Sequence, residues 1–220
     1  MKIHVNGICL AYEKSGGGAP LILLHGNGED RHIFGPLAQK LARHFTVYAI
    51  DSRNHGESGR TDDFSYSTMA QDILAFINTL DLGNVFLAGF SDGAIISLVL
   101  AMKHPAVVDK MALLGVNLSP GDFTDESYDF IKTTYEQTSD PLFNLMLTQP
   151  NITLEQVKNV DTPTLIIGAE NDVFNPETFT NLAAAMPNAQ LLIMKGHTHD
   201  SYVAENDILY SDLIGFFEVT

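Results

Sequence analysis

The sequence predicts an α/β protein with a doubly wound, mostly parallel sheet and helices on both of its faces. Short apolar runs alternate along the chain with longer segments of helical hydrophobic spacing, which is the pattern of strands joined by crossover helices. The chain has 220 residues, of which 45% are hydrophobic, and this is enough for a sizeable core. We therefore expect a single domain over residues 1–220.

Six apolar runs are the expected strands of the parallel sheet, because a strand covered on both faces is apolar along its whole length. They are residues 21–24, 46–50, 85–88, 111–114, 164–167 and 191–194. The first residues differ, since 4–5 and 8–12 flank Asn6-Gly7, a dipeptide that suits a type I′ turn. The chain is therefore expected to begin with a β-hairpin.

Helical spacing occurs in five segments between these runs, and Ser67 and Asn206 are the expected N-caps. The segments are residues 34–44, 67–82, 94–104, 176–186 and 207–217. Residues 118–160 break the alternation, because they hold weak helical patterns with several aromatic residues and no strand-like run. We expect this stretch to be a small cap insertion over the carboxyl ends of the strands, where ligands bind in such sheets.

Composition narrows the function classes. The formal net charge is −15, and the 12 Lys and Arg residues are scattered, so nucleic acid and anionic membranes are not expected partners. A single cysteine, Cys9, cannot form an internal disulfide or a thiolate zinc site. No apolar stretch is long enough to span a membrane, and the first residues do not resemble a signal peptide. We expect a cytoplasmic protein that acts on a small molecule without a cofactor or metal.

The residues Gly-Phe-Ser-Asp-Gly at 89–93 lie between a strand-like run and a helix-like run. A passage from strand to helix with almost no loop requires a sharp turn, and flanking glycines remove the side chains that would crowd it. Such a turn exposes the hydroxyl of Ser91 at the end of the strand. Ser91 is the candidate nucleophile.

A serine nucleophile needs a histidine base and a carboxylate that orients the histidine. In the strand–nucleophile–helix arrangement, the acid and then the histidine follow the serine along the chain. Glu170 and Asp172 follow one expected strand, and His197 and His199 follow the next. The residue types and their order favour a catalytic triad, with two candidates for each partner.

Several motifs together resemble the α/β-hydrolase fold family over nearly the whole chain. His-Gly-Asn-Gly at 25–28 resembles the oxyanion loop of that family, and residues 51–58 resemble its D-x-R-G-x-G-x-S turn with Asn54 in place of glycine. Residues 152–165 resemble the return from cap to core, and 168–172 the G-x-x-x-D acid loop. The exchange at Asn54 is mild, because asparagine tolerates a positive φ.

The resemblance implies roles for particular residues. It places the acid at Asp172 rather than Glu170. It favours His199 over His197, because the catalytic histidine of the family stands about five residues beyond the last strand, which is expected to end at Met194, and because residues 199–203 resemble an H-x-S-Y-V ending. It also implies that the backbone N–H groups of Asn27 and Asp92 form the oxyanion hole. His25 and His55 are expected to be structural.

The side chain of Asp92 has two interpretations, because a carboxylate facing the developing oxyanion would oppose catalysis. It can be an acidic first-turn residue favoured by the helix dipole. Alternatively, it attracts a cationic group of the substrate together with Asp122 or Asp125, as in amino-acid ester hydrolases that have a similar G-x-S-D-G turn. We refer to this turn at residues 89–93 as the elbow.

The function that these residues predict is a serine hydrolase that cleaves a small to medium carboxylic ester through an acyl-enzyme. A C–C bond hydrolase or a lactonase would use the same triad. A binding protein without catalytic activity could also share the scaffold. A metal hydrolase is a further alternative, because His-Thr-His-Asp at residues 197–200 resembles part of the H-x-H-x-D-H signature of metal hydrolases. Ser201, however, stands in place of the final histidine of that signature.

Overall fold

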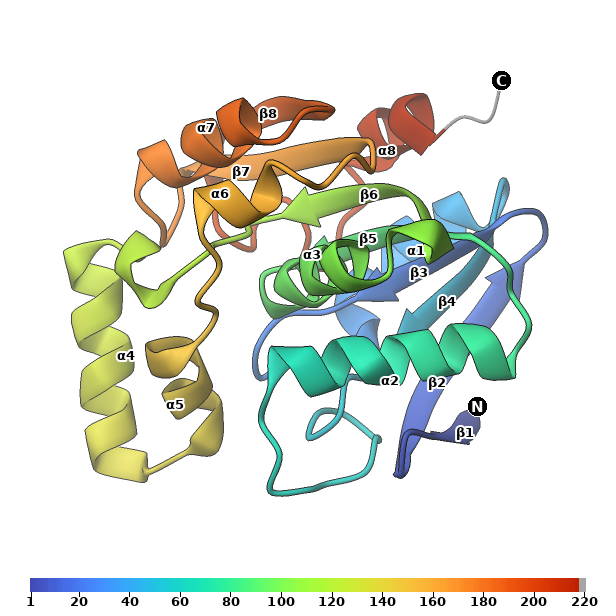
Figure 1. Cartoon of the computed structure of the whole chain (residues 1–220), viewed down its shortest axis with the longest axis horizontal. Coiled ribbons are helices and arrows are strands. Elements are labelled where there is room, and N and C mark those ends of the chain that lie inside the picture. The colour runs from blue at the N-terminus through green and yellow to red at the C-terminus, as the bar shows by residue number, and fades with distance from the viewer. Residues whose placement is uncertain (218–220) are drawn as a thin grey trace.

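A computed structural model describes residues 1–217, which form an eight-stranded sheet with helices on both faces (Figure 1). The strand order is β1-β2-β4-β3-β5-β6-β7-β8. β1 and β2 are antiparallel to each other, and β2 is antiparallel to β4. All later pairs, from β4–β3 to β7–β8, are parallel. The predicted α/β-hydrolase architecture is confirmed.

The strands follow the predicted runs, mostly with extensions of a few residues. They are β1 (Lys2–Val5), β2 (Ile8–Gly16), β3 (Pro20–Leu24), β4 (Thr46–Ile50), β5 (Val85–Phe90), β6 (Val108–Leu114), β7 (Thr164–Asn171) and β8 (Ala189–Thr198). The predicted hairpin is present, since β1 and β2 are joined by Asn6 and Gly7, whose φ angles are 45° and 76°. Positive φ at both central positions is what a type I′ turn requires.

The helices alternate with the strands as predicted. They are α1 (Gly35–Leu41), α2 (Tyr66–Thr79), α3 (Asp92–Lys103), α4 (Asp125–Thr138), α5 (Pro141–Thr148), α6 (Leu154–Val157), α7 (Pro176–Ala185) and α8 (Tyr210–Phe217). The predicted N-caps are wrong. Ser65 rather than Ser67 precedes α2, and α8 begins four residues after Asn206, whose side chain instead accepts from the N–H of Ile208.

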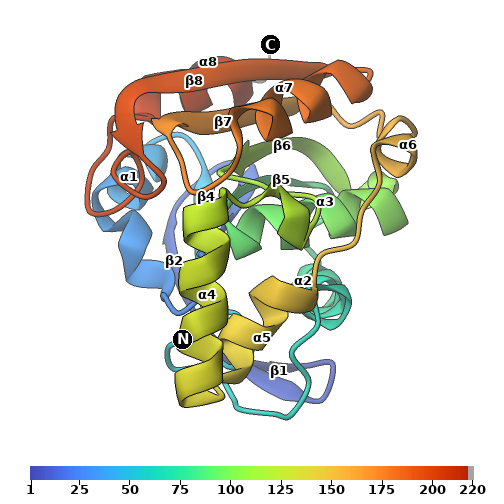
Figure 2. The same cartoon turned by 90° about the vertical axis from the view of Figure 1, so that its left-hand side faces the viewer.

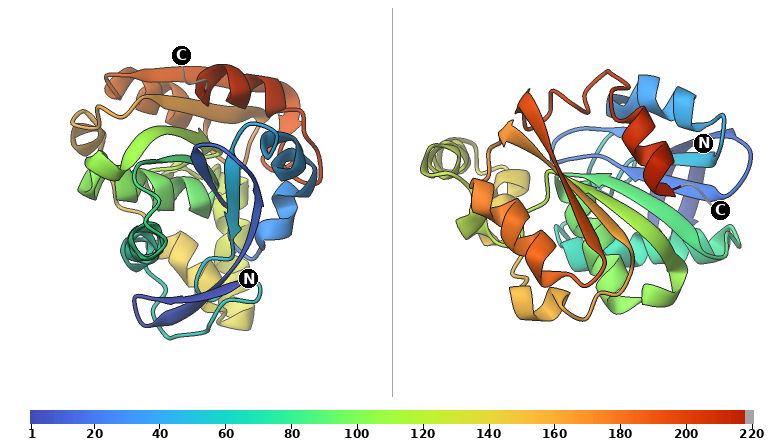
Figure 3. Two further views of the ribbon diagram at one scale, coloured as in Figure 1. Left: turned by 90° about the vertical axis from the view of Figure 1, so that its right-hand side faces the viewer. Right: turned by 90° about the horizontal axis from the view of Figure 1, so that it is seen from above.

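Two apolar layers enclose the sheet because successive strand residues point to opposite faces. On one face, Ile22, Leu87 and Leu113 pack with side chains of α2, α3 and α7. On the other face, Leu23 and Ala88 pack with side chains of α1 and α8. The view from above shows α1 and α8 on one side of the sheet and α2, α3 and α7 on the other (Figure 3). The strands β3, β5 and β6 are therefore buried between two helical layers.

The segment 118–160 holds α4, α5 and α6, as its helical pattern predicts. Figure 2, in which this side faces the viewer, shows α4 and α5 side by side at the end of the sheet where β5, β6 and β7 terminate. Thr124 and Asp140 accept backbone N–H bonds at the starts of α4 and α5. We refer to α4 and α5 as the cap helices.

A buried ion pair joins the loop after β4 to α2. The guanidinium of Arg53 donates to both carboxylate oxygens of Asp72, at 2.6 and 2.7 Å, and the side chains are 6% and 2% exposed. A bidentate pair in this environment is strong only while both partners are present, because removal of either leaves a buried charge without its main partner.

We predict that Asp72→Ala lowers the free energy of unfolding by about 3–5 kcal/mol, because it leaves Arg53 buried without its bidentate partner. Chemical denaturation measures the change. Glu155→Ala, which removes an exposed ion pair with Lys158, is the matched control and is expected to lower stability by less than about 1 kcal/mol. Equal losses in the two variants would contradict this account.

Candidate active site

Ser91 lies on a strained turn between β5 and α3. Its φ and ψ are 51° and −114°, a backbone conformation that L-residues rarely adopt. A Cβ at Gly89 would fall on the carbonyl of Gly93, and a Cβ at Gly93 would fall on the carbonyl of Leu24. Both positions therefore require glycine, and the turn holds Ser91 at the carboxyl edge of the sheet.

Ser91, His199 and Asp172 form one hydrogen-bonded line. Nε2 of His199 lies 3.1 Å from Oγ of Ser91, and Nδ1 of His199 lies 2.7 Å from Oδ1 of Asp172. A carboxylate accepts only, so Nδ1 carries the proton and Nε2 is free to accept the serine proton. The structure thus brings the three predicted residues together in the geometry of a serine nucleophile with its base.

Asp172 and His199 are both held by their surroundings. The carboxylate of Asp172 is buried and also accepts from the N–H groups of Ala169 and Val173. The imidazole of His199 lies between the rings of Phe90 and Phe174, with centroids 4.9 and 5.2 Å away. Tight packing leaves the imidazole little freedom to turn away from Ser91.

The competing residues Glu170 and His197 point elsewhere. Glu170 is exposed and accepts from the N–H of Gly196 at 2.8 Å, and His197 is partly exposed beside Oγ of Ser201. The expectation that the last strand ends at Met194 is wrong, because β8 continues to Thr198. The tips of β7 and β8 pair with each other beyond the apolar runs, and His199 directly follows the strand.

The loop after β3 lies beside the elbow, as the family resemblance implies. His25 is buried, and its Nε2 accepts from the N–H of Ser52, so its Nδ1 donates to the carbonyl of Gly26. Burial, with a smaller contribution from His55, lowers the pKa of His25 to about 4. The ring is therefore neutral at physiological pH and serves to support the loop.

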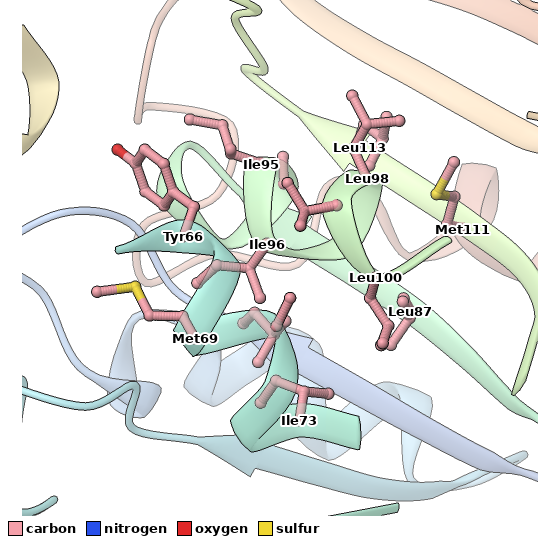
Figure 4. Packing of buried hydrophobic residues seen from close by; sticks show 14 of the residues in the cluster. Tyr66, Met69, Ile73, Leu87, Ile95, Ile96, Leu98, Leu100, Met111 and Leu113 are labelled. Atoms are coloured by element: carbon pink, nitrogen blue, oxygen red, sulfur yellow. The ribbon is translucent and has the colours of Figure 1, made fainter. Parts of the chain in front are cut away.

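The carboxylate of Asp92 is buried and hydrogen bonded. It accepts from the hydroxyl of Tyr66 at 2.7 Å and from Nδ2 of Asn27 at 3.0 Å. Burial raises the pKa of Asp92, while these two donors act in the opposite direction. Figure 4 shows Tyr66 at the edge of the apolar cluster, with its hydroxyl directed away from the labelled aliphatic side chains.

A cavity of about 720 Å³ opens above Ser91, between the sheet edge and the cap helices. Its cap side includes the apolar residues Phe130, Phe143 and Met146. Neither Asp122 nor Asp125 lines it, and the carboxylate of Asp122 instead accepts the N–H groups of Leu118 and Ser119. Acidic side chains line the cavity at other positions, which are Glu29, Asp92, Glu126, Asp140 and Asp200.

Glu29 and Tyr66 line the cavity, and sequence reasoning missed both. Glu29 folds back to accept from the N–H of Gly26 at 2.9 Å. Burial raises the pKa of Glu29 to about 7, against the opposing effects of this bond and of His199. A signal for Glu29 was available, because it is an acidic residue within the loop after β3; Tyr66 gave none, since it begins a helix distant in sequence.

The described part of the chain, residues 1–217, has no group of three His, Cys, Asp or Glu side chains arranged to hold a metal ion. Within the same residues, no helix is long and apolar enough to cross a membrane.

The fold and the serine–histidine–aspartate geometry are those of an α/β-hydrolase. A family model described as alpha/beta hydrolase fold matches residues 19–159, and another, described as TAP-like protein, matches residues 146–218. Serine hydrolase BPHL of Homo sapiens is 31% identical over 208 residues, which cover 80% of this chain and 71% of that protein. The chain belongs to the α/β-hydrolase family.

Two further comparisons extend this result. Ethanol acetyltransferase 1 of Cyberlindnera fabianii is 35% identical over 97 residues, which cover 43% of this chain and 29% of that protein. The match thus spans less than a third of that relative's length. The meta-cleavage product hydrolase CumD of Pseudomonas fluorescens IP01 superposes with a TM-score of 0.83 at 19% identity, over 99% of this chain and 97% of that one. This similarity concerns the fold.

We predict that Glu29→Gln stabilises the protein at pH 8 and has little effect at pH 4. In the unfolded chain Glu29 ionises near its ordinary pKa of 4.5, whereas in the folded protein it keeps its proton to about pH 7. The raised pKa therefore lowers stability progressively between these values and by a constant amount above them. Glutamine removes that penalty and still accepts from Gly26, so the expected gain at pH 8 is about 1–3 kcal/mol.

Urea denaturation of both proteins at the two pH values measures the difference. Glu136→Gln, on the exposed side of α4, is the matched control and should change stability equally at both. A Glu29→Gln effect that is the same at pH 4 and pH 8 would show that Glu29 ionises normally.

Proposed function

We propose that this chain is a serine hydrolase that cleaves a small to medium carboxylic ester through an acyl-enzyme intermediate. The observation that carries the proposal is the line of hydrogen bonds from Ser91 through His199 to Asp172, which opens onto the cavity. The relationship to a human serine hydrolase over most of the chain supports it.

In the proposed reaction, Oγ of Ser91 attacks the ester carbonyl while Nε2 of His199 takes its proton. Asp172 holds the tautomer and stabilises the imidazolium that forms. The tetrahedral oxyanion accepts from the backbone N–H groups of Asn27 and Asp92. His199 then donates the proton to the leaving alcohol. In the second half, His199 deprotonates a water molecule, which attacks the acyl carbonyl. The bond between the acyl carbon and Oγ of Ser91 then breaks, His199 returns the proton to Oγ, and the carboxylic acid is released.

The cavity supports the size and polarity of the proposed acyl group. Its volume of about 720 Å³ is within the usual range for small-molecule sites, and the cap side offers aromatic and aliphatic surface. The reaction as written draws only on groups of the protein itself and on water, so the proposed enzyme needs no cofactor or metal.

Three alternatives remain as proposals for this site. C–C bond hydrolysis and lactone opening would use the same nucleophile and base, and a non-catalytic binder would use only the cavity. A γ-lactone and a β-diketone of matched size distinguish the first two from ester cleavage, when kcat/KM is compared with that for the ester. Saturable binding of all three without turnover would favour the binder.

We predict that Ser91→Ala lowers kcat/KM for p-nitrophenyl butyrate by about 10⁴-fold or more, because no nucleophile remains in the elbow. Initial rates on the ester, with the variant checked for native circular dichroism, measure the loss. Turnover close to that of the wild type would exclude the proposed mechanism.

The chain offers a matched control for each partner of Ser91. Asp172→Asn is expected to lower kcat by about 10³–10⁴-fold, because an amide favours the wrong tautomer of His199. Glu170→Gln, only two residues away, should leave kcat near the wild-type value. His199→Ala and His197→Ala form a second pair with the same expectation. If kcat fell in Glu170→Gln or His197→Ala and not in the variants of Asp172 or His199, the assigned triad would be wrong.

We predict that kcat/KM for p-nitrophenyl esters is highest for acyl chains of about two to eight carbons and falls for chains of about twelve or more, because two short cap helices offer only a limited apolar surface to a long chain. A chain-length series at fixed pH measures this preference. An activity that still rises at the longest chains would contradict the proposed substrate size.

A further inference from the structure

Asn27 occupies a junction of three parts of the molecule. It follows β3 in the loop beside the elbow, and it faces the first turn of α3 and the start of α5. Its side-chain amide donates to Oδ2 of Asp92 at 3.0 Å and to the backbone carbonyl of Leu142 at 3.2 Å. Both partners are acceptors, which requires the NH₂ end of the amide to face them.

The bond to Asp92 joins the two residues whose backbone N–H groups are the proposed oxyanion donors. One residue belongs to the loop after β3 and the other to α3, so their separation is not set by the chain between them. The Asp92 end is fixed, because its carboxylate is buried and also accepts from the hydroxyl of Tyr66, which is 2% exposed. The side-chain bond therefore restrains the distance between the two donors.

The bond to Leu142 extends the same restraint to the cap helices. Leu142 lies in the first turn of α5, where its N–H is held by the N-cap Asp140 at 2.9 Å. Leu142, Phe143 and Met146 also line the cavity. An acyl group in that cavity would contact α5, and any shift of α5 would act on Asn27 through the carbonyl of Leu142.

We propose that Asn27 is a positioning residue. Its side chain fixes the two oxyanion donors, the backbone N–H groups of Asn27 and Asp92, relative to each other and couples them to the cap helix α5. This inference rests on the proposed function, because it concerns the donors of that reaction. The two side-chain bonds of Asn27, to Asp92 and to Leu142, are called the bridge below. The bridge also explains why a carboxylate follows the nucleophile, because Asp92 anchors it and is turned toward Tyr66 and Asn27 by their hydrogen bonds.

The first test compares Asn27→Ala and Asn27→Asp, which both keep the backbone N–H. Alanine removes both side-chain bonds, and aspartate also brings a second carboxylate against Asp92. We expect kcat to fall by about 10–100-fold in the alanine variant and further in the aspartate variant, because misplaced donors stabilise the oxyanion less well. KM should change far less than kcat. Unchanged kcat in Asn27→Ala would overturn the proposal, and so would a loss confined to KM.

A double-mutant cycle tests the connection to the cap. Asp140→Ala frees the first turn of α5, and we expect it to lower kcat by about 3–10-fold alone but by less than about twofold in the Asn27→Ala background. Thr124→Ala, which removes the N-cap of the other cap helix α4, is the matched control and should combine additively with Asn27→Ala. An Asp140→Ala effect of equal size in both backgrounds would disprove the coupling.

Hydrogen exchange separates this proposal from the proposed function. Peptides that cover residues 26–34 should lose protection in both Asn27→Ala and Asp140→Ala, and this readout requires no turnover. Lost protection in an enzyme that cleaves no ester would support the bridge and reject the esterase proposal. Esterase activity that depends on Ser91, with protection unchanged in both variants, would support the esterase proposal and reject the bridge.

Discussion

The site depends on the close approach of the first turn of α3 to the carbonyl end of β3. Gly93 packs directly on the carbonyl of Leu24, and Gly89 packs on Gly93, so the strand-to-helix turn is short enough to hold Ser91 in a strained conformation. The same approach brings Asp92 within reach of Asn27, which follows β3. A side chain at either glycine would push α3 away from the strand. Ser91 and the loop after β3 would then move apart. Backbone packing is therefore the constraint from which the remaining geometry follows.

Parallel strand directions then supply the partners of Ser91. The residues after β5, β7 and β8 lie at one edge because these strands run the same way, and this explains how residues 91, 172 and 199 meet across long separations in sequence. The pairing of the tips of β7 and β8 decides between neighbouring candidates. It engages Glu170 with Gly196 and carries His199 just beyond the last paired residue.

The sequence was sufficient for the architecture, the hairpin and the order of the triad, because these depend on periodicity, on Asn6-Gly7 and on chain order. The end of β8 was not predictable from its apolar run, since the mostly exposed segment from Lys195 to Thr198 follows a register shift, after which only Thr198 pairs with β7, at Asn171. The N-cap at Ser67 failed because α2 begins one residue earlier, at Tyr66, which places Ser67 inside the first turn of the helix. The bridge from Asp92 through Asn27 to Leu142 joins residues 65 and 115 positions apart, and no local pattern reports such contacts.

In the proposed reaction, Ser91 carries the acyl group between the two halves of the cycle. Rapid-quench mass spectrometry of the protein mixed with p-nitrophenyl acetate, followed by peptide mapping, tests it most directly. A single acetyl group is expected on the peptide that contains Ser91, and it should form with the release of nitrophenol and disappear as acetate is produced. Nitrophenol release without an acetylated peptide, or with the acetyl group on another residue, would contradict the claim.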